Sequence, residues 1–273
     1  MRLESNELAK NIRESVLKMT SYGGSSHIAS CLSIADIMAV LYSDVLRVDK
    51  NDPLFANRDY FILSKGHAGA AAYAALAHVG FFDTSWLDSH YQNGSIMSGH
   101  VSHKGIPGVE LSTGSLGQGL GVATGLAYGI AAEERDNGVF VVMSDGECDE
   151  GSVWEAALFA GHHELTNLCA IIDYNKLQSI KSIAETLALE PFADKWASFG
   201  WSVIEVDGHD HSSLRRVMKS DSSKPKVIIC HTTKGKGVSF MENEVVWHYR
   251  SPSDADLERA LTEIRSANLE ADS

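Results

Sequence analysis

Polar side chains that suit a metal ion follow two successive β-branched runs of the chain. Asp145 and Gly146 come directly after the first run, and Asn175 follows the second. Consecutive strands of a parallel sheet end at the same edge, so a carboxylate and an amide oxygen at these positions can meet on one hard cation. Gly146 lets the backbone approach a phosphate closely. On these residues alone, a plain strand-to-helix turn with a cap at Asn175 stays open beside a site for a metal-bound diphosphate.

Three histidines lie among glycines and serines: His27 in SYGGSSH, His67 in SKGHAGA and His100 in SGHVSHKG. The chain has 12 histidines, and for any single one a solvated side chain or an ordinary core hydrogen bond is the commoner role. These three fall in loops expected near the N-termini of helices. A neutral imidazole there can donate to anionic oxygens or move protons near neutral pH.

A stripe of glycines follows the third histidine. Gly117, Gly121, Gly125 and Gly129 recur every four residues in a stretch expected to be helical. Glycine in a helix costs about 1 kcal/mol relative to alanine, so the stripe needs a packing reason. This spacing puts small residues on one face, which permits close helix-to-helix contact, as at a subunit interface. The stretch is not a nucleotide P-loop, because the Lys-Ser/Thr ending is missing.

The last segment with chemical interest is HTTKGKGVSFMENEVVWHYRSP at 231–252. Following a β-branched run, K-G-K-G by itself is typical of a flexible basic loop. Glu150, in CDEGS, is by itself typical of a negative charge near a helix N-terminus. Neither feature assigns a function without a wider pattern.

Taken together, these segments resemble those of transketolase, a family of thiamine diphosphate enzymes. The resemblance runs from about Glu7 to Arg250, with the motifs in the family's order and at similar spacing. The stretch 144–178 resembles the thiamine diphosphate motif, G-D-G followed by a distant N, along its whole length. Ser144 stands in place of the first glycine, and we expect this small side chain to be tolerated.

The resemblance implies which residues hold the cofactor and its metal, Mg²⁺ or Ca²⁺. The metal ligands are expected to be two side chains and one backbone carbonyl, from Asp145, Asn175 and Leu177. Contacts to thiamine diphosphate are expected from His67, Gly114, Leu116, Gly146, Asn175 and His248. Within this set, Gly114 and Leu116 match contacts to the aminopyrimidine ring, and Gly146 matches an N–H close to the diphosphate.

The same resemblance implies a catalytic role for three histidines. The residue that matches His27 lies beside the reactive carbon, and the one that matches His100 contacts the terminal hydroxyl of the donor sugar. His248 is the best match to a late histidine that reaches the diphosphate and the substrate. Glu150 matches an acid that meets acids of a partner across the interface, whereas His103 falls where the family's spacing varies and is assigned no role.

A complete transketolase is more than twice as long as this chain of 273 residues. In the family, the later part supplies the glutamate and the aromatic pocket around the aminopyrimidine ring, and no segment after Arg250 can form such a domain. The resemblance therefore implies the N-terminal subunit of a two-chain transketolase, inactive without a C-terminal subunit that carries the pyrimidine-binding domain. We expect two copies of each chain (α2β2), because closed two-fold symmetry is common. The reaction implied is transfer of a two-carbon ketol group from a ketose phosphate to an aldose.

Three other functions stay open. Another thiamine diphosphate enzyme, such as a deoxyxylulose phosphate synthase or a two-subunit keto-acid dehydrogenase, is disfavoured by STGSLGQG and the three spaced histidines. A pathway-specific ketol transferase for an unusual sugar fits the same residues, since acceptor contacts lie largely on the missing half. A non-catalytic cofactor-binding subunit is suggested by Ser144 and opposed by the retention of Asp145, Asn175 and the histidines.

These residues need a scaffold that brings strand ends together. Short β-branched runs at 139–143, 168–173, 203–206 and 227–230 alternate with longer helical patterns, which predicts a doubly wound α/β fold with a mainly parallel sheet flanked by helices. Helices are predicted at 5–20, 33–46, 66–80, 115–134, 152–164, 191–199, 211–219 and 254–268. We expect one thiamine diphosphate-binding domain over 1–273, with a helical tail from about 253.

Charge, hydropathy and cysteine content limit the partners and the cellular compartment that we expect for this protein. A net charge of −13 disfavours binding to nucleic acid and to anionic membrane surfaces. No segment approaches the roughly 18 apolar residues of a membrane span, and the first 20 residues lack the apolar core of a secretory signal. The four cysteines are scattered without C-x-x-C spacing, which favours reduced thiols and a cytoplasmic protein.

Overall fold

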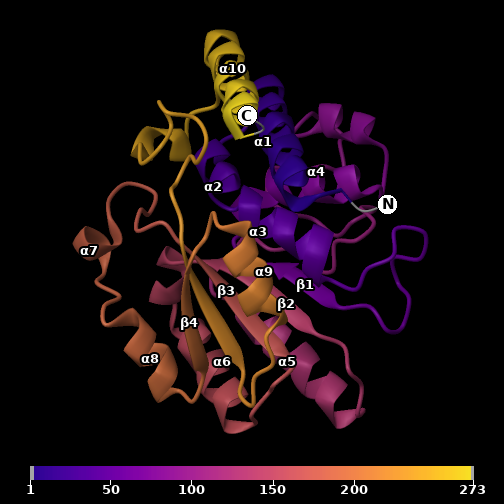
Figure 1. Ribbon diagram of the computed structural model, residues 1–273, viewed down its shortest axis with the longest axis vertical. Helices are drawn as coiled ribbons and strands as arrows, with labels where there is room; N and C mark the ends of the chain where they lie inside the picture. Colours follow the sequence, from indigo (N-terminus) through magenta and orange to yellow (C-terminus); the bar gives the residue numbers. More distant parts are fainter. Residues whose placement is uncertain (1–2, 272–273) are drawn as a thin grey trace.

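A five-stranded parallel sheet forms the centre of the protein, in the order β1-β2-β3-β5-β4 (Figure 1). The computed structural model describes residues 3–271, with side chains for 3–266, so both ends of the predicted domain fall outside this range. The strands are β1 (Tyr60–Leu63), β2 (Val139–Ser144), β3 (Leu168–Tyr174), β4 (Ser202–Asp207) and β5 (Lys226–His231). All adjacent strands pair in parallel, which confirms the predicted doubly wound α/β fold.

Helices cover both faces of the sheet. One layer consists of α1 (Ser5–Gly23), α2 (Ile28–Ser33), α3 (Ala35–Val40), α4 (Gly69–Val79), α9 (His211–Lys219) and α10 (Asp254–Ala271). The opposite layer consists of α5 (Gly119–Ala132), α6 (Gly151–His162), α7 (Ile183–Thr186) and α8 (Phe192–Ser198). Shorter helical turns occupy Leu41–Val45, Gly66–Ala68, Thr84–Ser89, Gly146–Asp149 and Val245–His248.

Each face of the sheet has its own hydrophobic core. Successive side chains of a strand point to opposite faces, so alternate residues join different cores. In β3, Cys169 and Ile171 pack against the layer that contains α1, whereas Ala170 and Ile172 pack against the layer that contains α5. Every residue of β3 is buried, as expected for the central strand of a sheet covered on both sides.

Three elements differ from those predicted, one of them the four-residue α7, which overlaps no predicted helix. β1 is not among the predicted strands, because its sequence YFIL is only four residues long and contains one β-branched residue. The predicted helix 33–46 is wrong as a single element: α2 ends at Ser33, α3 begins at Ala35, and a π-helical turn follows. The Ser33 hydroxyl donates to Asp173 on β3, which ties the end of α2 to the sheet. The other predicted helices overlap observed ones.

The loops that follow β2, β3 and β5 lie side by side at one edge of the sheet. Ser144 is in register with Asp173, and Asp173 is in register with Cys230. Doubly wound folds bind ligands outside the carboxyl ends of their strands. The strand order therefore brings the two predicted metal-binding segments to the expected position.

All four cysteines are buried and carry free thiols. Burial raises the pKa of Cys31 and of Cys169 to about 11, so both thiols are neutral at pH 7. Within the part of the chain that the structure describes, we find no helix with the length and apolar character needed to cross a membrane.

Candidate active site

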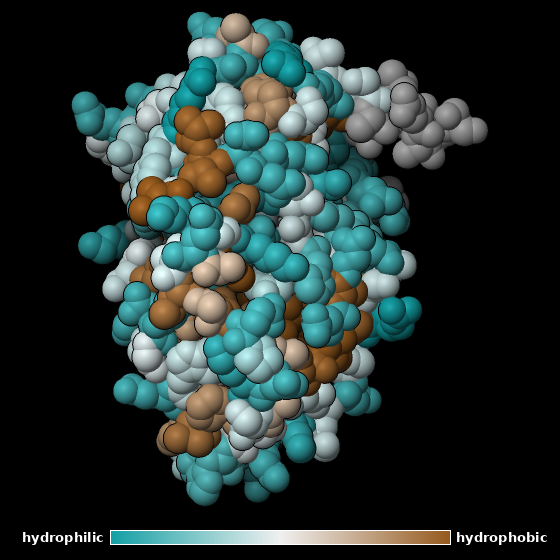
Figure 2. Space-filling model, turned by 90° about the vertical axis from the view of Figure 1, so that its left-hand side faces the viewer, coloured by the Kyte–Doolittle hydropathy of each residue, from teal (hydrophilic) through white to brown (hydrophobic). Residues whose placement is uncertain are grey.

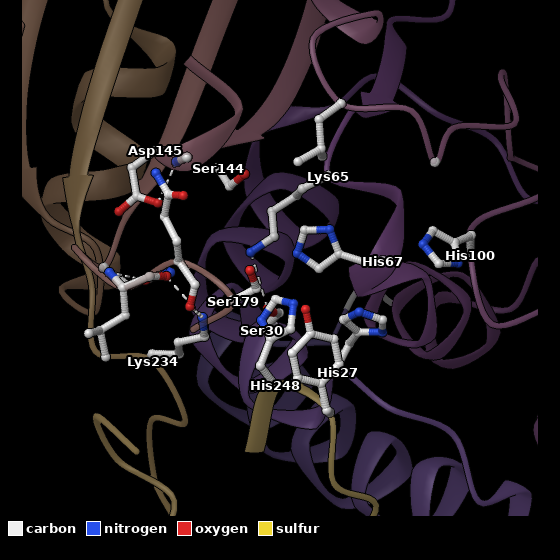
Figure 3. Close-up of a pocket in the computed structure, with 17 residues that line it drawn as sticks. His27, Ser30, Lys65, His67, His100, Ser144, Asp145, Ser179, Lys234 and His248 are labelled. Atoms are coloured by element: carbon white, nitrogen blue, oxygen red, sulfur yellow. Dashed lines mark hydrogen bonds between the residues drawn. The ribbon is translucent and has the colours of Figure 1, made fainter. Parts of the chain in front are cut away.

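A cavity of about 280 Å³ opens at the carboxyl ends of the strands (Figure 3). Loops after β2, β3 and β5 form one side of it, and segments from the layer that contains α1 and α2 form the other. It is lined by all the residues predicted to contact cofactor, metal or substrate: His27, His67, His100, Gly114, Leu116, Asp145, Gly146, Asn175, Leu177 and His248. Glu150 is not among the lining residues.

Asp145 offers a buried carboxylate to this cavity. It is 1% exposed, and its oxygens accept the backbone N–H groups of Gly146 at 2.7 Å and Lys176 at 2.6 Å. Burial and the nearby charge of Asp173 raise the pKa of Asp145 to about 7. Both hydrogen-bond partners are neutral amides, so a cation beside the carboxylate would stabilise its charged form.

Asn175 presents its oxygen on the same side. Its Nδ2 donates to Asp173 Oδ2 at 3.1 Å, and because a carboxylate only accepts, the nitrogen of the amide must face Asp173. The amide oxygen accepts from Leu177 N at 3.0 Å and keeps a second lone pair. In the described residues no three His, Cys, Asp or Glu side chains form a metal site. The predicted ligand set is of another kind, with one carboxylate, one amide and one carbonyl oxygen, and such oxygens suit Mg²⁺ or Ca²⁺.

The carbonyl of Leu177, the third predicted ligand, accepts from a lysine. Lys234 Nζ donates to Leu177 O at 2.9 Å and to Gln178 O at 3.0 Å. Lys234 is only 2% exposed, so the interpretation of K-G-K-G as a flexible basic loop is wrong for this residue. Burial and the charge of Lys65 lower the pKa of Lys234 to about 8. Its side chain lines the cavity and points toward that of Lys65 (Figure 3).

A second ammonium comes from Lys65, which lies opposite Lys234 in the cavity (Figure 3). Lys65 forms a fully buried ion pair with Asp173 of β3. Asp173 also accepts from the hydroxyls of Ser33 and Thr232. Burial raises the pKa of Asp173, but the charge of Lys65 and these hydrogen bonds together hold it below its usual value. Removing one partner would leave an uncompensated buried charge, at a cost of about 3–5 kcal/mol.

Four imidazoles cluster at the other end of the cavity. The ring of His27 lies 4.8 Å from that of His248, 5.2 Å from that of His67 and 5.6 Å from that of His100, between centroids. His27 has a left-handed backbone, with φ of 74°, and its N–H donates to the carbonyl of His248 at 2.9 Å. Its Nδ1 is hydrogen-bonded to Ser26 Oγ at 2.8 Å. Unfavourable backbone geometry of this kind persists where surrounding contacts fix a functional side chain.

Burial keeps most of these imidazoles neutral. It lowers the pKa of His27 to about 4 and that of His248 to about 3, and nearby lysines act in the same direction. The pKa of His67 is also well below its usual value, first because of burial and then because of Lys65. His248 Nδ1 is buried and finds no hydrogen-bond partner among the described residues. A neutral imidazole with a free ring nitrogen can accept or donate a proton at a ligand.

Two glycines let the histidine loops pack closely. A Cβ at Gly66 would lie 2.3 Å from Thr113 O, and one at Gly69 would lie 2.6 Å from Val101 N. Val101 N also donates to Gly66 O at 2.9 Å. These contacts bring the segments that carry His67 and His100 against the start of STGSLGQG.

Glu147 is a buried acid that the sequence analysis did not single out. It accepts from the Ser64 hydroxyl, from Gly117 N at 2.8 Å and from Ser144 N at 3.3 Å. Burial raises its pKa. The side chain therefore ties the segment 114–117, which lines the cavity, to the end of β2.

The predicted glycine stripe divides into two parts. Gly117 lies in the turn before α5 with φ of 81°, and a Cβ there would lie 2.6 Å from Glu150 Cβ, so its prediction as a helical stripe residue is wrong. The remaining three have no atom within 4 Å of an added Cβ: Gly121, Gly125 and Gly129. Glu150 is exposed just before α6 and makes no side-chain capping hydrogen bond.

Several residues that line the cavity were missed: Ser30, Lys65, Gln178, Ser179, Lys234 and Tyr249. The two lysines gave a usable signal, since Lys65 follows an apolar run and directly precedes a Gly-His pair. Lys234 follows β5 after Thr232 and Thr233 and directly precedes a Gly-Lys pair. The serines and the glutamine gave no such signal, because these residue types are common in loops of any function.

Buried side-chain oxygens, two buried ammonium groups and neutral imidazoles meet at the edge of the sheet where doubly wound α/β folds bind their ligands. Residues 4–264 match the family model described as transketolase, thiamine diphosphate binding domain. The chain belongs to the transketolase family.

Relatives of this chain fall into two length classes. It is 38% identical to an apulose-4-phosphate transketolase subunit of Phocaeicola vulgatus, over 97% of this chain and 95% of that protein. It is 37% identical to the 6-deoxy-6-sulfo-D-fructose transketolase subunit SqwG of a Clostridium species, over 94% of each. The transketolase structure from Campylobacter jejuni superposes with a TM-score of 0.89 at 27% identity, covering 97% of this chain but 43% of that one.

Proposed function

We propose that this chain is the N-terminal subunit of a two-chain transketolase, which transfers a two-carbon ketol group from a ketose phosphate to an aldose. The observation that carries the proposal is the convergence of Asp145, Asn175 and two buried lysines with a cluster of imidazoles in one cavity. A scaffold that only bound the cofactor would have no use for the imidazoles beyond the diphosphate. Relatives of equal length are named as transketolase subunits, which supports a divided enzyme.

The sheet edge would hold the metal and the diphosphate. Thiamine diphosphate supplies, when bound, the nucleophilic carbon and the electron sink for cleavage beside a ketose carbonyl. Asp145 and Asn175 would ligate Mg²⁺ or Ca²⁺ through oxygens, with the Leu177 carbonyl as third ligand. Lys65 and Lys234 would offset the charge of the diphosphate.

The remaining lining residues would orient the cofactor rings and the sugar. His67 and the N–H of Gly146 would contact the diphosphate, and Gly114 and Leu116 the aminopyrimidine ring. His27, His100 and His248 would accept and return protons at substrate hydroxyls, with His248 also reaching the diphosphate. The lowered pKa values leave His27 and His248 neutral at pH 7 and so free to accept a proton, and an anionic substrate would raise each pKa toward the working range.

A partner chain would cover the mouth of the cavity. The face that carries α7 and α8 shows several apolar patches among hydrophilic side chains (Figure 2). Large exposed side chains flank the cavity-lining segments on both sides: Ile180, Leu187, Val246 and Tyr249. Exposed apolar residues around a site are typical of a docking surface. We assign this rim to the C-terminal subunit with the pyrimidine-binding domain.

A second copy of this chain would cover α5 and α6. Exposed apolar side chains on these helices accompany the three open glycines: Val122, Tyr128, Leu158 and Phe159. A two-fold axis here would let one helix approach its copy closely and would bring Glu150 to the interface, in an α2β2 assembly. We also propose that the chain acts as one domain with α10 as its tail. The reduced thiols support a cytoplasmic location.

Complementation tests the divided enzyme. The purified chain is assayed for ketol transfer from a ketose phosphate with thiamine diphosphate and Mg²⁺, alone and after addition of a candidate C-terminal subunit. We expect no turnover from the folded chain alone and turnover after mixing. Robust activity without a partner would contradict the proposal.

A further inference from the structure

A buried polar network connects the helices around α1 to the loop that carries Lys234. Asp36, buried on α3, accepts from both ends of the Arg13 guanidinium, at 2.9 and 2.5 Å. Two histidines that follow β4 bond the same carboxylate, His209 through Nδ1 at 2.7 Å and His211 through Nε2 at 3.0 Å. None of these four residues lines the cavity, and the proposed function uses none of them.

His209 and His211 differ in their second partners. Nε2 of His209 accepts the backbone N–H of Thr233, at 2.8 Å, the residue immediately before the cavity lysine. Because Nε2 accepts, the ring proton is on Nδ1 and is donated to Asp36, so the two bonds select one tautomer. His211 instead bonds the Ser5 hydroxyl on α1, at 2.8 Å, away from this loop.

The network holds the backbone on both sides of Lys234. His209 binds the residue before it, and Arg13 Nε donates to the carbonyl of Lys236, two residues after it, at 3.2 Å. Both side chains are organised by the same carboxylate of Asp36. A lysine ammonium ends a flexible four-carbon stem, so its position depends on a well-placed backbone.

The segment DGHDH that follows β4 is shaped to place the His209 ring. Asp207 accepts the N–H of His209 at 2.8 Å, which closes a turn. A Cβ at Gly208 would lie 2.4 Å from Thr232 Cγ2, so only glycine allows this turn to pack against the lysine loop. Asp210 then caps α9 through two backbone N–H groups. The turn at Asp207, the close contact at Gly208 and the cap of α9 together restrict the orientation of the His209 ring.

We propose that His209 is a positioning residue, which holds the 232–236 backbone so that Lys234 presents its ammonium to the diphosphate. The inference rests on the proposed role of Lys234 in diphosphate binding. A network that only joined α1 to α3 would make His209 and His211 equivalent, since each gives Asp36 one hydrogen bond.

The matched variants His209→Leu and His211→Leu distinguish these roles. Each loses one hydrogen bond to Asp36, but only the first frees the N–H of Thr233. Amide hydrogen exchange on the full chain should be about tenfold faster across 232–236 in H209L, the effect of roughly one hydrogen bond, and unchanged in H211L. Equal exchange in the two variants would overturn the proposal. H209Q keeps an acceptor for Thr233 and a donor for Asp36, so it should retain most of the protection and replaces H209L if that variant does not fold.

Cofactor affinity completes the test. Thiamine diphosphate with Mg²⁺ is titrated by calorimetry into the chain assembled with its partner. We expect a Kd about tenfold higher in H209L, partial recovery in H209Q and no change in H211L. Lys234→Met provides the reference. If K234M binds as tightly as wild type, the proposed role of Lys234 fails; if K234M binds weakly and H209L does not, only the positioning role of His209 fails.

Discussion

Replacement of Asp145 by asparagine separates the cost of a buried carboxylate from its use as a ligand. The side chain is 1% exposed, and burial and Asp173 raise its pKa to about 7. One pKa unit corresponds to about 1.4 kcal/mol, so a rise of about three units means that the charged form destabilises the folded chain by about 4 kcal/mol. Asparagine is neutral but can accept from only one of the two N–H groups that bond the carboxylate, which costs about 1–3 kcal/mol. In EDTA at pH 8 we therefore expect D145N to be more stable than wild type by about 1–3 kcal/mol.

The stability that D145N gains over wild type depends on pH, and the direction of this dependence follows from the raised pKa of Asp145. Below about pH 4, the ordinary pKa of an aspartate, the carboxyl is protonated in both folded and unfolded chains, and burial has no charge to penalise. Between about pH 4 and 7 the unfolded chain loses this proton first, so the wild type becomes less stable relative to the variant as pH rises. Burial also lowers the pKa of His27 and of His248, but these groups titrate in both proteins and largely cancel in the difference.

Urea unfolding of both proteins in EDTA, at pH 5 and pH 8, measures this difference. We expect the stability of the variant relative to wild type to rise by about 3 kcal/mol from pH 5 to pH 8, so that at pH 5 the variant has no advantage. Addition of Mg²⁺ and thiamine diphosphate should stabilise the assembled wild type and not the variant, which lacks the charged ligand. A gap that is the same at both pH values would refute the electrostatic argument. Equal stabilisation by the cofactor would refute the metal assignment.

Three further predictions concern other parts of the site. In the assembled enzyme, His27→Ala and His100→Ala should bind the cofactor normally but lose about 10²–10³ in turnover number, since contacts to developing charge are worth roughly 3–4 kcal/mol; His67→Ala should instead weaken cofactor binding in calorimetry. Near-normal turnover of the first two at saturating substrates would contradict their catalytic role. Glu147→Leu should lower the free energy of unfolding by about 2–4 kcal/mol because three donors lose their acceptor, with a smaller loss for Glu147→Gln; equal losses in urea would argue against hydrogen bonding as the cause. Leu158→Asp should shift sedimentation toward smaller assemblies, and an unchanged profile would remove α6 from the proposed interface.

The central strands, and the meeting of the segments that follow them, could be predicted because their physics is local. β3 is buried on both faces, so its sequence is apolar along most of its length, and the residues after β2 and β3 must meet once the strands are parallel. That Asp145 and Asn175 share one cavity therefore followed from the parallel strands, whereas their role as metal ligands rests on the resemblance to transketolase and stays a prediction. The four-residue β1 could not be recognised, since it owes its place to pairing with β2 rather than to its own sequence.

The lysines show why the rest of the site was harder to predict. By itself, the K-G-K-G that contains Lys234 is typical of a flexible loop, because glycines close by normally indicate mobility. Its order depends on partners distant in the chain: the carbonyls of Leu177 and Gln178 accept its ammonium, and His209 holds its backbone. Lys65 likewise depends on Asp173, more than 100 positions away. Such pairings arise only after the chain has folded.

The open face of α5 and α6 bears on how a cell must make this protein. Leu158 and Phe159 are exposed, and the glycines of α5 have open space where a side chain would lie. A newly made chain carries this apolar face into a crowded solution before any assembly occurs, and such surfaces promote aggregation. On the arrangement proposed above, a second copy of the same chain covers this face, so synthesis of many copies close together would shorten that exposure. A face that is covered only by a second copy of the chain therefore places a demand on the local concentration at which the chain is made.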